Sequence, residues 1–270
     1  MIVKTEAVAL QIRPWSKTSH IVTWLTPRHG RVVTSVKGAC RPKSAFLGQY
    51  DLFYTCELLF YPRERNGIHA IRECVPLQRR DALRDEWRAA AAAAYIADLT
   101  ARAAPDGHHP HPQLFGRLTE ALDRLAGHVE PLPDTLARYE IHLLHLLGLL
   151  PDLTACPDCY PEGKEWFRFS LPAGRILCRH VAEAKPGEAV ISLHHTVQKH
   201  FLALKNGMLQ APAADPAEKK NEGKVNLPLG LSRFLGIFIS FHLDVPATVR
   251  RVTMEMMGMT PAHNHAPEEM

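Results

Sequence analysis

The segment VTWLTPRHGRVVTSVKGACRPKS, residues 22–44, sets the architecture of the first part of the chain. Residues 20–25 and 31–36 are rich in strand-forming residues, and a turn signal from Pro27 to Gly30 separates them. A short loop with several cations follows the second run. The segment therefore predicts a β-hairpin that leads into a basic loop.

Three further strand candidates surround this hairpin. Residues 6–12 alternate so that Val8, Leu10 and Ile12 lie on one face, and residues 52–61 and 67–75 complete a set of five. Five short strands in this length, with one wider gap in the middle, predict a small closed Greek-key barrel of the OB type. A five-stranded SH3-like barrel fits nearly as well on periodicity alone.

The chain changes character at Asp81. Residues 81–104 are rich in Ala and contain no Gly or Pro, which predicts a helix. Further helical patterns cover 113–127, 132–150, 192–207 and 229–245. The expected fold class is α+β, a five-stranded OB barrel followed by an all-helical domain with an inserted zinc-knuckle-like module. The expected limits are 1–78 for the barrel, 79–257 for the helical domain, 154–186 for the module, 211–228 for a flexible loop and 258–270 for a disordered tail.

Composition places the chain among ordinary globular proteins. Its 270 residues are 46% hydrophobic and 22% charged. It has no apolar run of the roughly 18 residues that cross a bilayer, and its first residues lack the pattern of a signal peptide. We expect a cytoplasmic protein that does not enter membranes.

The charge is unevenly distributed. The chain carries 32 Lys and Arg against 28 Asp and Glu; residues 1–80 hold 13 of the cations and 5 of the acids, a balance of +8 against −4 for the remainder. A basic N-terminal segment favours contact with a polyanion. The alternative is a solvent-exposed basic surface that binds no ligand, which would have the same composition. The candidate phosphate contacts are Arg28, Arg31, Lys37, Arg41 and Lys43. Nearby aromatic residues, Trp15 and Phe46 among them, either stack on bases or fill the barrel.

No catalytic motif accompanies these features. The chain has no G-x-S-x-G elbow and no H-E-x-x-H pair, so the sequence does not predict an enzyme.

Three segments, together with their order along the chain, resemble the RecO family of bacterial recombination mediators. Residues 22–44 are similar to the family's L-T-x-x-x-G turn and K-G-x-x-x-x-x-S loop. RYEIHLLHLLGLLPDLTACPDC (138–159) and AGRILC (173–178) are similar to its helical segment leading into C-x-x-C and to its second knuckle. The resemblance implies a mediator that binds single- and double-stranded DNA, anneals strands, and with the partner RecR helps to load RecA. A protein-interaction adaptor that uses the barrel as a docking surface is the alternative.

The resemblance also implies a second partner, the C-terminal tail of single-stranded-DNA-binding protein. That tail is acidic with an apolar end, so its site should combine arginines with an apolar groove. The candidates, chosen by their chemistry, are Arg117, Arg124 and Arg138 beside the Leu-rich helices.

The cysteines of residues 156–178 indicate a structural zinc site that departs from the family pattern. Cys156, Cys159 and Cys178 are clustered, but Val181 stands where a second C-x-x-C would place its last cysteine. Either His180 completes a Cys₃His site, or the three thiols are the remnant of a lost one. Four protein ligands would leave no position open for a reacting water.

Overall fold

The computed structural model describes residues 2–63, 67–104, 109–161, 163–180, 185–210 and 228–258. By its internal contacts the chain forms two compact units: the described residues up to Leu150 make up the barrel unit, and those from Pro151 onward make up the C-terminal unit. This division by contacts does not test the domain limits expected from the sequence, which stay predictions.

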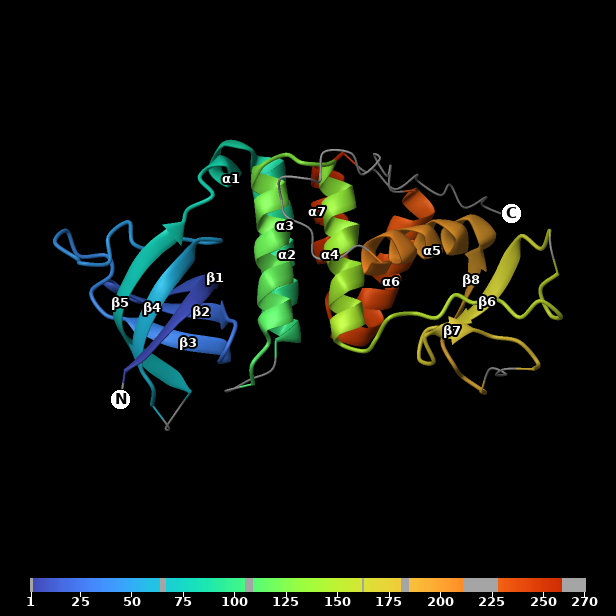
Figure 1. Ribbon diagram of the computed structural model, residues 1–270, viewed down its shortest axis with the longest axis horizontal. Helices are drawn as coiled ribbons and strands as arrows, with labels where there is room; N and C mark the ends of the chain where they lie inside the picture. The colour runs from blue at the N-terminus through green and yellow to red at the C-terminus, as the bar shows by residue number, and fades with distance from the viewer. Residues whose placement is uncertain are drawn as a thin grey trace, which may run out of the picture. The chain divides into compact units, whose positions relative to one another are not determined.

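The barrel unit begins with a closed five-stranded barrel (Figure 1). Its strands are β1 (Val3–Ser16), β2 (Ser19–Thr26), β3 (Gly30–Val36), β4 (Thr55–Tyr61) and β5 (Ile68–Gln78). They pair in the order β1-β2-β3-β5-β4, with β3 and β5 parallel and the other pairs antiparallel. This closed Greek-key arrangement confirms the prediction of an OB fold.

Aromatic residues fill the barrel. Trp24, Tyr54 and Phe60 are buried in its core, and the indole N–H of Trp24 donates to Oγ1 of Thr34 over 2.9 Å. A buried indole usually needs such an acceptor, because an unpaired N–H in an apolar core is costly. Trp24 is therefore a core residue and cannot stack on a ligand.

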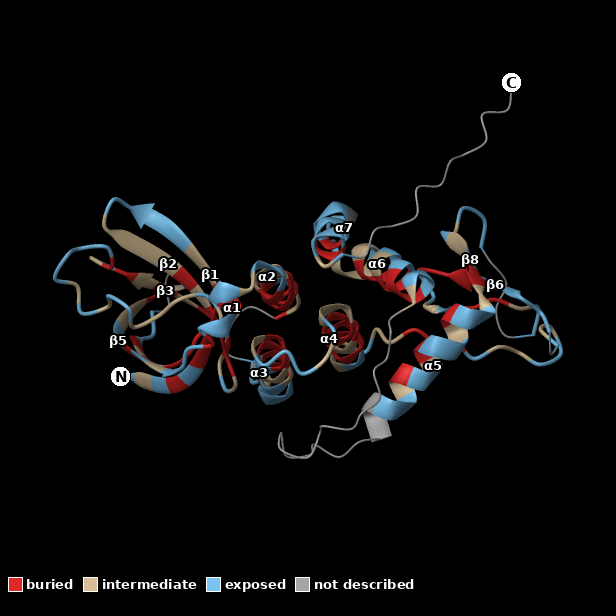
Figure 2. Ribbon diagram, turned by 90° about the horizontal axis from the view of Figure 1, so that it is seen from above, coloured by how far each residue is buried: buried red, intermediate tan, exposed pale blue. Residues whose placement is uncertain are grey.

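Four helices follow the barrel: α1 (Ala82–Asp85), α2 (Trp87–Ala103), α3 (Pro112–Ala126) and α4 (Leu132–Leu146). The helices α2 and α3 each have a buried and an exposed face, whereas nearly all of α4 is buried or half-buried (Figure 2). The single helix expected from Asp81 is wrong, because it breaks at Glu86. The Glu86 carboxylate accepts from the N–H groups of Arg88 and Ala89 and caps a new helix start.

A buried arginine ties these helices to the barrel. The Arg80 side chain is 1% exposed, and its Nε donates to Asp123 of α3 over 2.6 Å. Its Nη1 donates to the carbonyl oxygen of Phe53 and to Oγ1 of Thr55. Buried charge is tolerated only when it is paired and hydrogen-bonded, and Arg80 satisfies both conditions.

The C-terminal unit combines a small antiparallel sheet with helices. The strands β6 (Trp166–Ser170), β7 (Arg175–Ile176) and β8 (Val190–His194) lie in the order β7-β6-β8. The helices are α5 (His195–Gln210), α6 (Leu229–Leu243) and α7 (Ala247–Met256). The helix expected from Ser192 begins only at His195, because residues 190–194 pair with β6. The sheet and α7 were not predicted.

Two expected segments fall largely outside the described residues. They are 211–227 of the predicted loop and 259–270 of the predicted tail. Within the described part of the chain, no helix has the length and apolarity needed to span a membrane.

Candidate nucleic-acid interface, arginine pocket and metal centre

Lys37, Arg41 and Lys43 come together in an exposed loop after β3, which we call the basic loop, residues 37–50. The loop is built of successive turns: the Arg41 N–H donates to the Gly38 carbonyl over 3.1 Å, and the Ser44 N–H to the Arg41 carbonyl over 2.9 Å. Gly38 has a φ of +71°, a conformation that other residues rarely adopt. The three cations are thus held close to one another on a folded loop.

The basic loop is fixed to the barrel at both of its ends. The Cys40 N–H donates to the carbonyl of Thr18 over 3.2 Å. His20 of β2 hydrogen-bonds through Nδ1 to the Tyr50 hydroxyl (2.7 Å) and through Nε2 to the Cys40 thiol (3.2 Å). Phe46 and Tyr50 pack against the barrel core. These contacts preorganise the loop, so binding a ligand would cost little ordering entropy.

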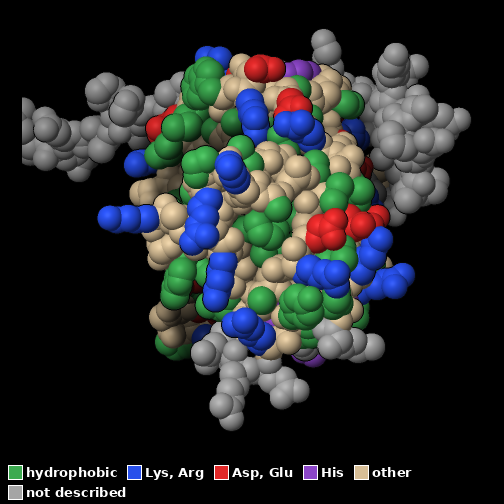
Figure 3. All heavy atoms as spheres, turned by 90° about the vertical axis from the view of Figure 1, so that its left-hand side faces the viewer, with side chains coloured by type: hydrophobic (Ala, Val, Ile, Leu, Met, Phe, Trp, Pro, Cys, Tyr) green, Lys and Arg blue, Asp and Glu red, His purple; other side chains and the backbone are tan. Residues whose placement is uncertain are grey.

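The segment that contains the loop carries only positive charge. Residues 7–50 contain seven Lys and Arg and no Asp or Glu, namely Arg13, Lys17, Arg28, Arg31, Lys37, Arg41 and Lys43. Figure 3 shows Lys and Arg side chains spread over one side of the molecule, with hydrophobic side chains between them. None of the ion pairs found among the described residues involves a cation of the basic loop. The three cations of the basic loop are therefore available to phosphates.

Two of the predicted DNA-contacting residues lie elsewhere. Arg28 is exposed in the turn between β2 and β3, at the opposite end of β3 from the basic loop. Arg31 is half-buried, and its Nη1 donates to the carbonyl of Ala101 near the end of α2 over 2.9 Å. Arg31 thus satisfies a helix C-terminus, where a cation also interacts favourably with the helix dipole.

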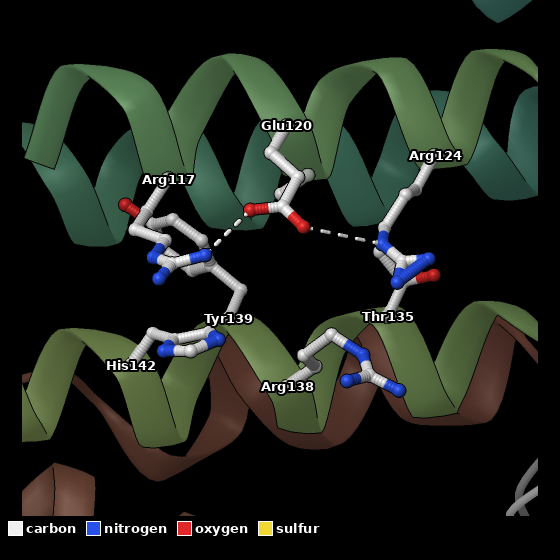
Figure 4. A pocket seen from close by; sticks show the side chains of 8 residues that line it. Arg117, Glu120, Arg124, Thr135, Arg138, Tyr139 and His142 are labelled. Atoms are coloured by element: carbon white, nitrogen blue, oxygen red, sulfur yellow. Dashed lines mark hydrogen bonds and ion pairs between the residues drawn. The ribbon is translucent and has the colours of Figure 1, made fainter. Parts of the chain in front are cut away.

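The three arginines predicted for a partner tail line one pocket between α3 and α4 (Figure 4). Arg117 and Arg124 project from α3, seven residues and two turns apart, and Arg138 faces them from α4. Glu120 lies between the two α3 arginines, 2.8 Å from Arg117 and 3.6 Å from Arg124. Arg138 contacts Glu130 over 3.4 Å. The pocket already holds carboxylates against its arginines.

The pocket also contains a histidine kept neutral by its surroundings. Burial is the main cause that lowers the pKa of His142 to about 4, and the charges of Arg117 and Arg138 add to it while Glu120 opposes it. Tyr139 forms part of the apolar lining, and the depression is small and open to solvent. It is much smaller than a usual small-molecule site, so a ligand would meet the arginines from the surface.

Because the fold keeps His142 neutral, we expect the protein to lose stability when the pH falls from 6.5 to about 4. Between pH 6.5 and 4 the unfolded chain binds a proton on His142 that the folded chain does not, so the free energy of unfolding should fall by up to about 3 kcal/mol as the pH drops through this range. Urea unfolding at several pH values measures this loss. His142→Gln should flatten the pH dependence above pH 4, and an equally steep profile in that variant would show that other groups cause it.

The predicted metal ligands lie together in the C-terminal unit. Three sulfur atoms, from Cys156, Cys159 and Cys178, lie within 4.8 Å of one another. Nδ1 of His180 is 3.5 Å from the sulfurs of both Cys156 and Cys159. The contact with His180 is the main cause that lowers the pKa of the Cys156 thiol. Asp158 is a weaker candidate, because its carboxylate is 78% exposed and lies 3.9 Å from His180.

These distances fit a tetrahedral ion. Zinc–sulfur bonds of about 2.3 Å and zinc–nitrogen bonds of about 2.0–2.1 Å at a tetrahedral angle separate sulfur and nitrogen by about 3.6 Å. The two separations between His180 Nδ1 and the cysteine sulfurs agree with that value. The donor set of three thiols and one imidazole is also one that structural zinc sites use. The three thiols, and an imidazole 3.5 Å from two of them, are therefore donors suited to the Cys₃His alternative.

Comparison with protein families accounts for nearly the whole chain. The family described as "Recombination protein O N terminal" matches residues 1–80, and "Recombination protein O C terminal" matches residues 84–250. The chain belongs to the RecO family. The boundary between the two RecO matches falls at the start of the helices, directly after Arg80.

Several curated RecO proteins are similar in sequence to this chain over most of their own length. A "DNA repair protein RecO" from Anaeromyxobacter sp. (strain K) is 30% identical over 79% of this chain and 83% of its own. Those from Alkaliphilus metalliredigens and Bacillus subtilis are 27% and 26% identical, over 90% and 69% of this chain and 95% and 71% of their own. The family assignment thus rests on both units.

Sequence reasoning overlooked one feature of this RecO barrel. The absence of acidic residues between Glu6 and Asp51 is visible in the sequence and marks the basic surface more sharply than the net charge of residues 1–80. It also brings Arg13 and Lys17, exposed at the end of the β1–β2 hairpin, into the candidate DNA interface.

Proposed function

We propose that this RecO-family protein is a recombination mediator that acts by binding rather than by catalysis. In this proposal it binds single- and double-stranded DNA and anneals complementary strands. Together with RecR, it helps RecA to load onto strands coated with single-stranded-DNA-binding protein. Its place of action would be the cytoplasm, at the nucleoid during repair.

One observation carries the DNA-binding part of the proposal. The basic loop presents Lys37, Arg41 and Lys43 on a preorganised surface where acidic residues are absent from residues 7–50. Cations that neutralise phosphates bind nucleic acid of any sequence and release its counterions. A mediator that acts wherever DNA is damaged needs this kind of sequence-independent contact. Arg28 and Arg31 remain predicted contacts, although their positions give them less support.

The arginine pocket supports the second part, capture of the acidic tail of single-stranded-DNA-binding protein. Glu120 already bridges Arg117 and Arg124, which shows that the pocket accommodates a carboxylate. An incoming tail would replace this carboxylate with its own, and its apolar end would lie against Ala121 and Tyr139. Charge-assisted hydrogen bonds from arginine provide the affinity that such an exchange needs.

The third part is structural zinc, held by Cys156, Cys159, Cys178 and His180. Bound zinc would stabilise a module whose connecting loop buries few side chains, because metal binding contributes directly to the folding of such modules. No residue of the basic loop is involved, so the site has a supporting role in this proposal.

Annealing of complementary oligonucleotides, bare or coated with single-stranded-DNA-binding protein, tests DNA binding and tail capture together. The protein should accelerate annealing of both. Arg138→Gln should weaken binding of the isolated tail peptide about tenfold, since a charged hydrogen bond contributes about 1.5–3 kcal/mol. The same variant should lose annealing of coated strands and keep annealing of bare strands.

Two further variants make this prediction decisive. Arg102→Gln removes an arginine that is ion-paired to Asp98 on α2, outside the pocket, and should leave both activities intact. Glu120→Gln removes the carboxylate that competes with the tail and should tighten tail binding. If Arg138→Gln reduced both annealing reactions equally, the pocket would not be a separate partner site; a protein that binds no bare DNA would instead be the adaptor.

A further inference from the structure

Trp15 is the most exposed of the large hydrophobic residues in the described part of the chain, at 69%. It lies at the end of β1, where the register with β2 shifts between Pro14 and Ser16. Such irregularities in an antiparallel pair redirect a side chain out of the regular alternation. The fold therefore places an indole in solvent at the end of the β1–β2 hairpin.

The neighbouring aromatic residues are used differently. Trp24 lies in the barrel core, and Phe46 and Tyr50 pack against that core from the basic loop. Trp24 is wholly buried and Phe46 and Tyr50 are half-buried, so none of the three exposes its ring as fully as Trp15 does. Of these four aromatic residues, only Trp15 has a ring that is largely exposed to solvent.

The hairpin end is continuous with the basic loop. Thr18, in the turn between β1 and β2, accepts a hydrogen bond from the Cys40 N–H over 3.2 Å, and His20 beside it contacts the Cys40 thiol. The exposed cations Arg13 and Lys17 lie two residues on either side of Trp15. The indole is thus surrounded by positive charge and has no acidic residue nearby in the chain.

We propose that Trp15 is a stacking platform for an unpaired nucleobase, and that it gives the protein a preference for single strands over duplex. The inference rests on the proposed DNA-binding function and assigns a residue to it. Cations around an exposed aromatic ring are the arrangement that holds single strands, with the phosphates on the cations and a base on the ring. A nucleobase in a duplex is covered on both faces by its neighbours, so only an unpaired base can occupy the indole.

The charge around Trp15 favours nucleic acid as the occupant. A protein partner that covered this face would have to be strongly acidic to match Arg13, Lys17 and the basic loop. A DNA strand supplies both the negative charge and the flat ring in one chain. Stacking also tolerates every base, which agrees with binding that does not depend on sequence.

Binding of a short oligothymidine and of a blunt duplex, measured by fluorescence anisotropy at one salt concentration, tests the proposal. Trp15→Ala should weaken single-strand binding about tenfold, in the range found for loss of one stacked base, and change duplex binding little. Trp15→Phe should keep most of the affinity, since it retains a ring. Trp87→Ala is the matched control, because Trp87 is 55% exposed on α2 and should have no effect.

Intrinsic fluorescence gives a second measurement. The chain has four tryptophans, and oligothymidine should quench emission in the wild type and in Trp87→Phe but much less in Trp15→Phe. Unchanged single-strand affinity in Trp15→Ala, or an equal loss for single strand and duplex, would overturn the proposal. If Trp15→Ala weakened binding only to strands coated with single-stranded-DNA-binding protein, the proposal would also be overturned, and Trp15 would be a protein contact.

The basic-loop variants separate this inference from the proposed function. If replacing Arg41 and Lys43 reduces DNA binding while Trp15→Ala does not, the DNA site stands and only the stacking role fails. If neither change affects DNA binding, the proposed interface itself is wrong.

Discussion

Replacing Lys37, Arg41 and Lys43 together by Ala should weaken binding to single-stranded DNA about a hundredfold at about 0.1 M salt. Each phosphate neutralised on a single strand contributes about 0.7 to the slope of log affinity against log salt. Three lost contacts therefore reduce that slope by about 2. Between a reference of about 1 M salt and about 0.1 M salt, one decade, a slope smaller by about 2 means an affinity about a hundredfold lower. The effect should be similar for all sequences, because phosphates carry no sequence information.

A matched triple variant separates the location of the charge from its amount. Arg84, Arg88 and Arg102 lie on α1 and α2, and their replacement by Ala changes the net charge by the same three units. In salt titrations of the two triple variants, only the basic-loop variant should show a smaller slope of log affinity against log salt. Equal slopes in the two variants would mean that overall charge, and not this loop, attracts DNA.

The barrel could be predicted because its strands follow local rules. Buried and half-buried positions alternate along β3, as the period of a strand requires, and the turn at Gly30 uses a positive φ; both features are visible in a short window of sequence. The alternation expected for residues 6–12 is wrong, because residues 7–10 are all buried. The choice between an OB and an SH3-like barrel was open because it depends on which distant strands pair. The parallel contact of Val33 with Ile68 decides it, and no local pattern encodes that contact.

Long-range pairing also explains the missed sheet of the C-terminal unit. Residues 192–194 run directly into α5, so the helical pattern predicted from the sequence extends over them, but residues 190–194 pair with the distant residues 166–170. The exposed and buried positions of β6 alternate, yet the strand is too short to stand out from the polar segment around it. Local periodicity therefore assigned the strand to the helix.

Charge was the weakest guide to individual residues. Arg31 belongs to the same basic segment as Lys37, but the fold uses its guanidinium to satisfy a carbonyl of α2. Arg80 has the same chemistry and lies inside the barrel unit as a structural ion pair. Sequence alone does not distinguish a cation that meets a ligand from one that completes the fold, because the difference lies in burial.

The arginine pocket and the cysteine cluster were easier to anticipate. Arg117 and Arg124 are seven residues apart, which places them on one face of any helix. Cys156 and Cys159 have the spacing that allows two thiols to bind one ion from a single turn. The fourth ligand was open in the sequence, and the position of His180 between two thiols is what the fold adds.

That position leads to the second large effect, on the C-terminal unit. The protein should purify with about one zinc per chain, and a chelator that removes it should loosen residues 154–180 first, because metal binding contributes to the folding of such modules. His180→Ala should reduce zinc affinity by more than the roughly 10- to 100-fold that loss of an outer-shell partner costs. It should also lower the melting temperature, while DNA affinity changes little because the basic loop belongs to the other unit.

Zinc content by mass spectrometry, thermal melting and hydrogen exchange of residues 154–180 measure these effects, and His200→Ala is the control. His200 is an exposed histidine of α5 in the same unit, and its Nδ1 contacts the carbonyl of Thr196 in its own helix, so its loss should leave zinc content unchanged. A stable protein without zinc that tolerates His180→Ala would show that the three thiols are a remnant. Retained zinc in His180→Ala, combined with zinc loss in Asp158→Asn, would instead make the Asp158 carboxylate the fourth ligand, since its oxygen lies within 4.8 Å of the Cys156 sulfur and of a ring nitrogen of His180.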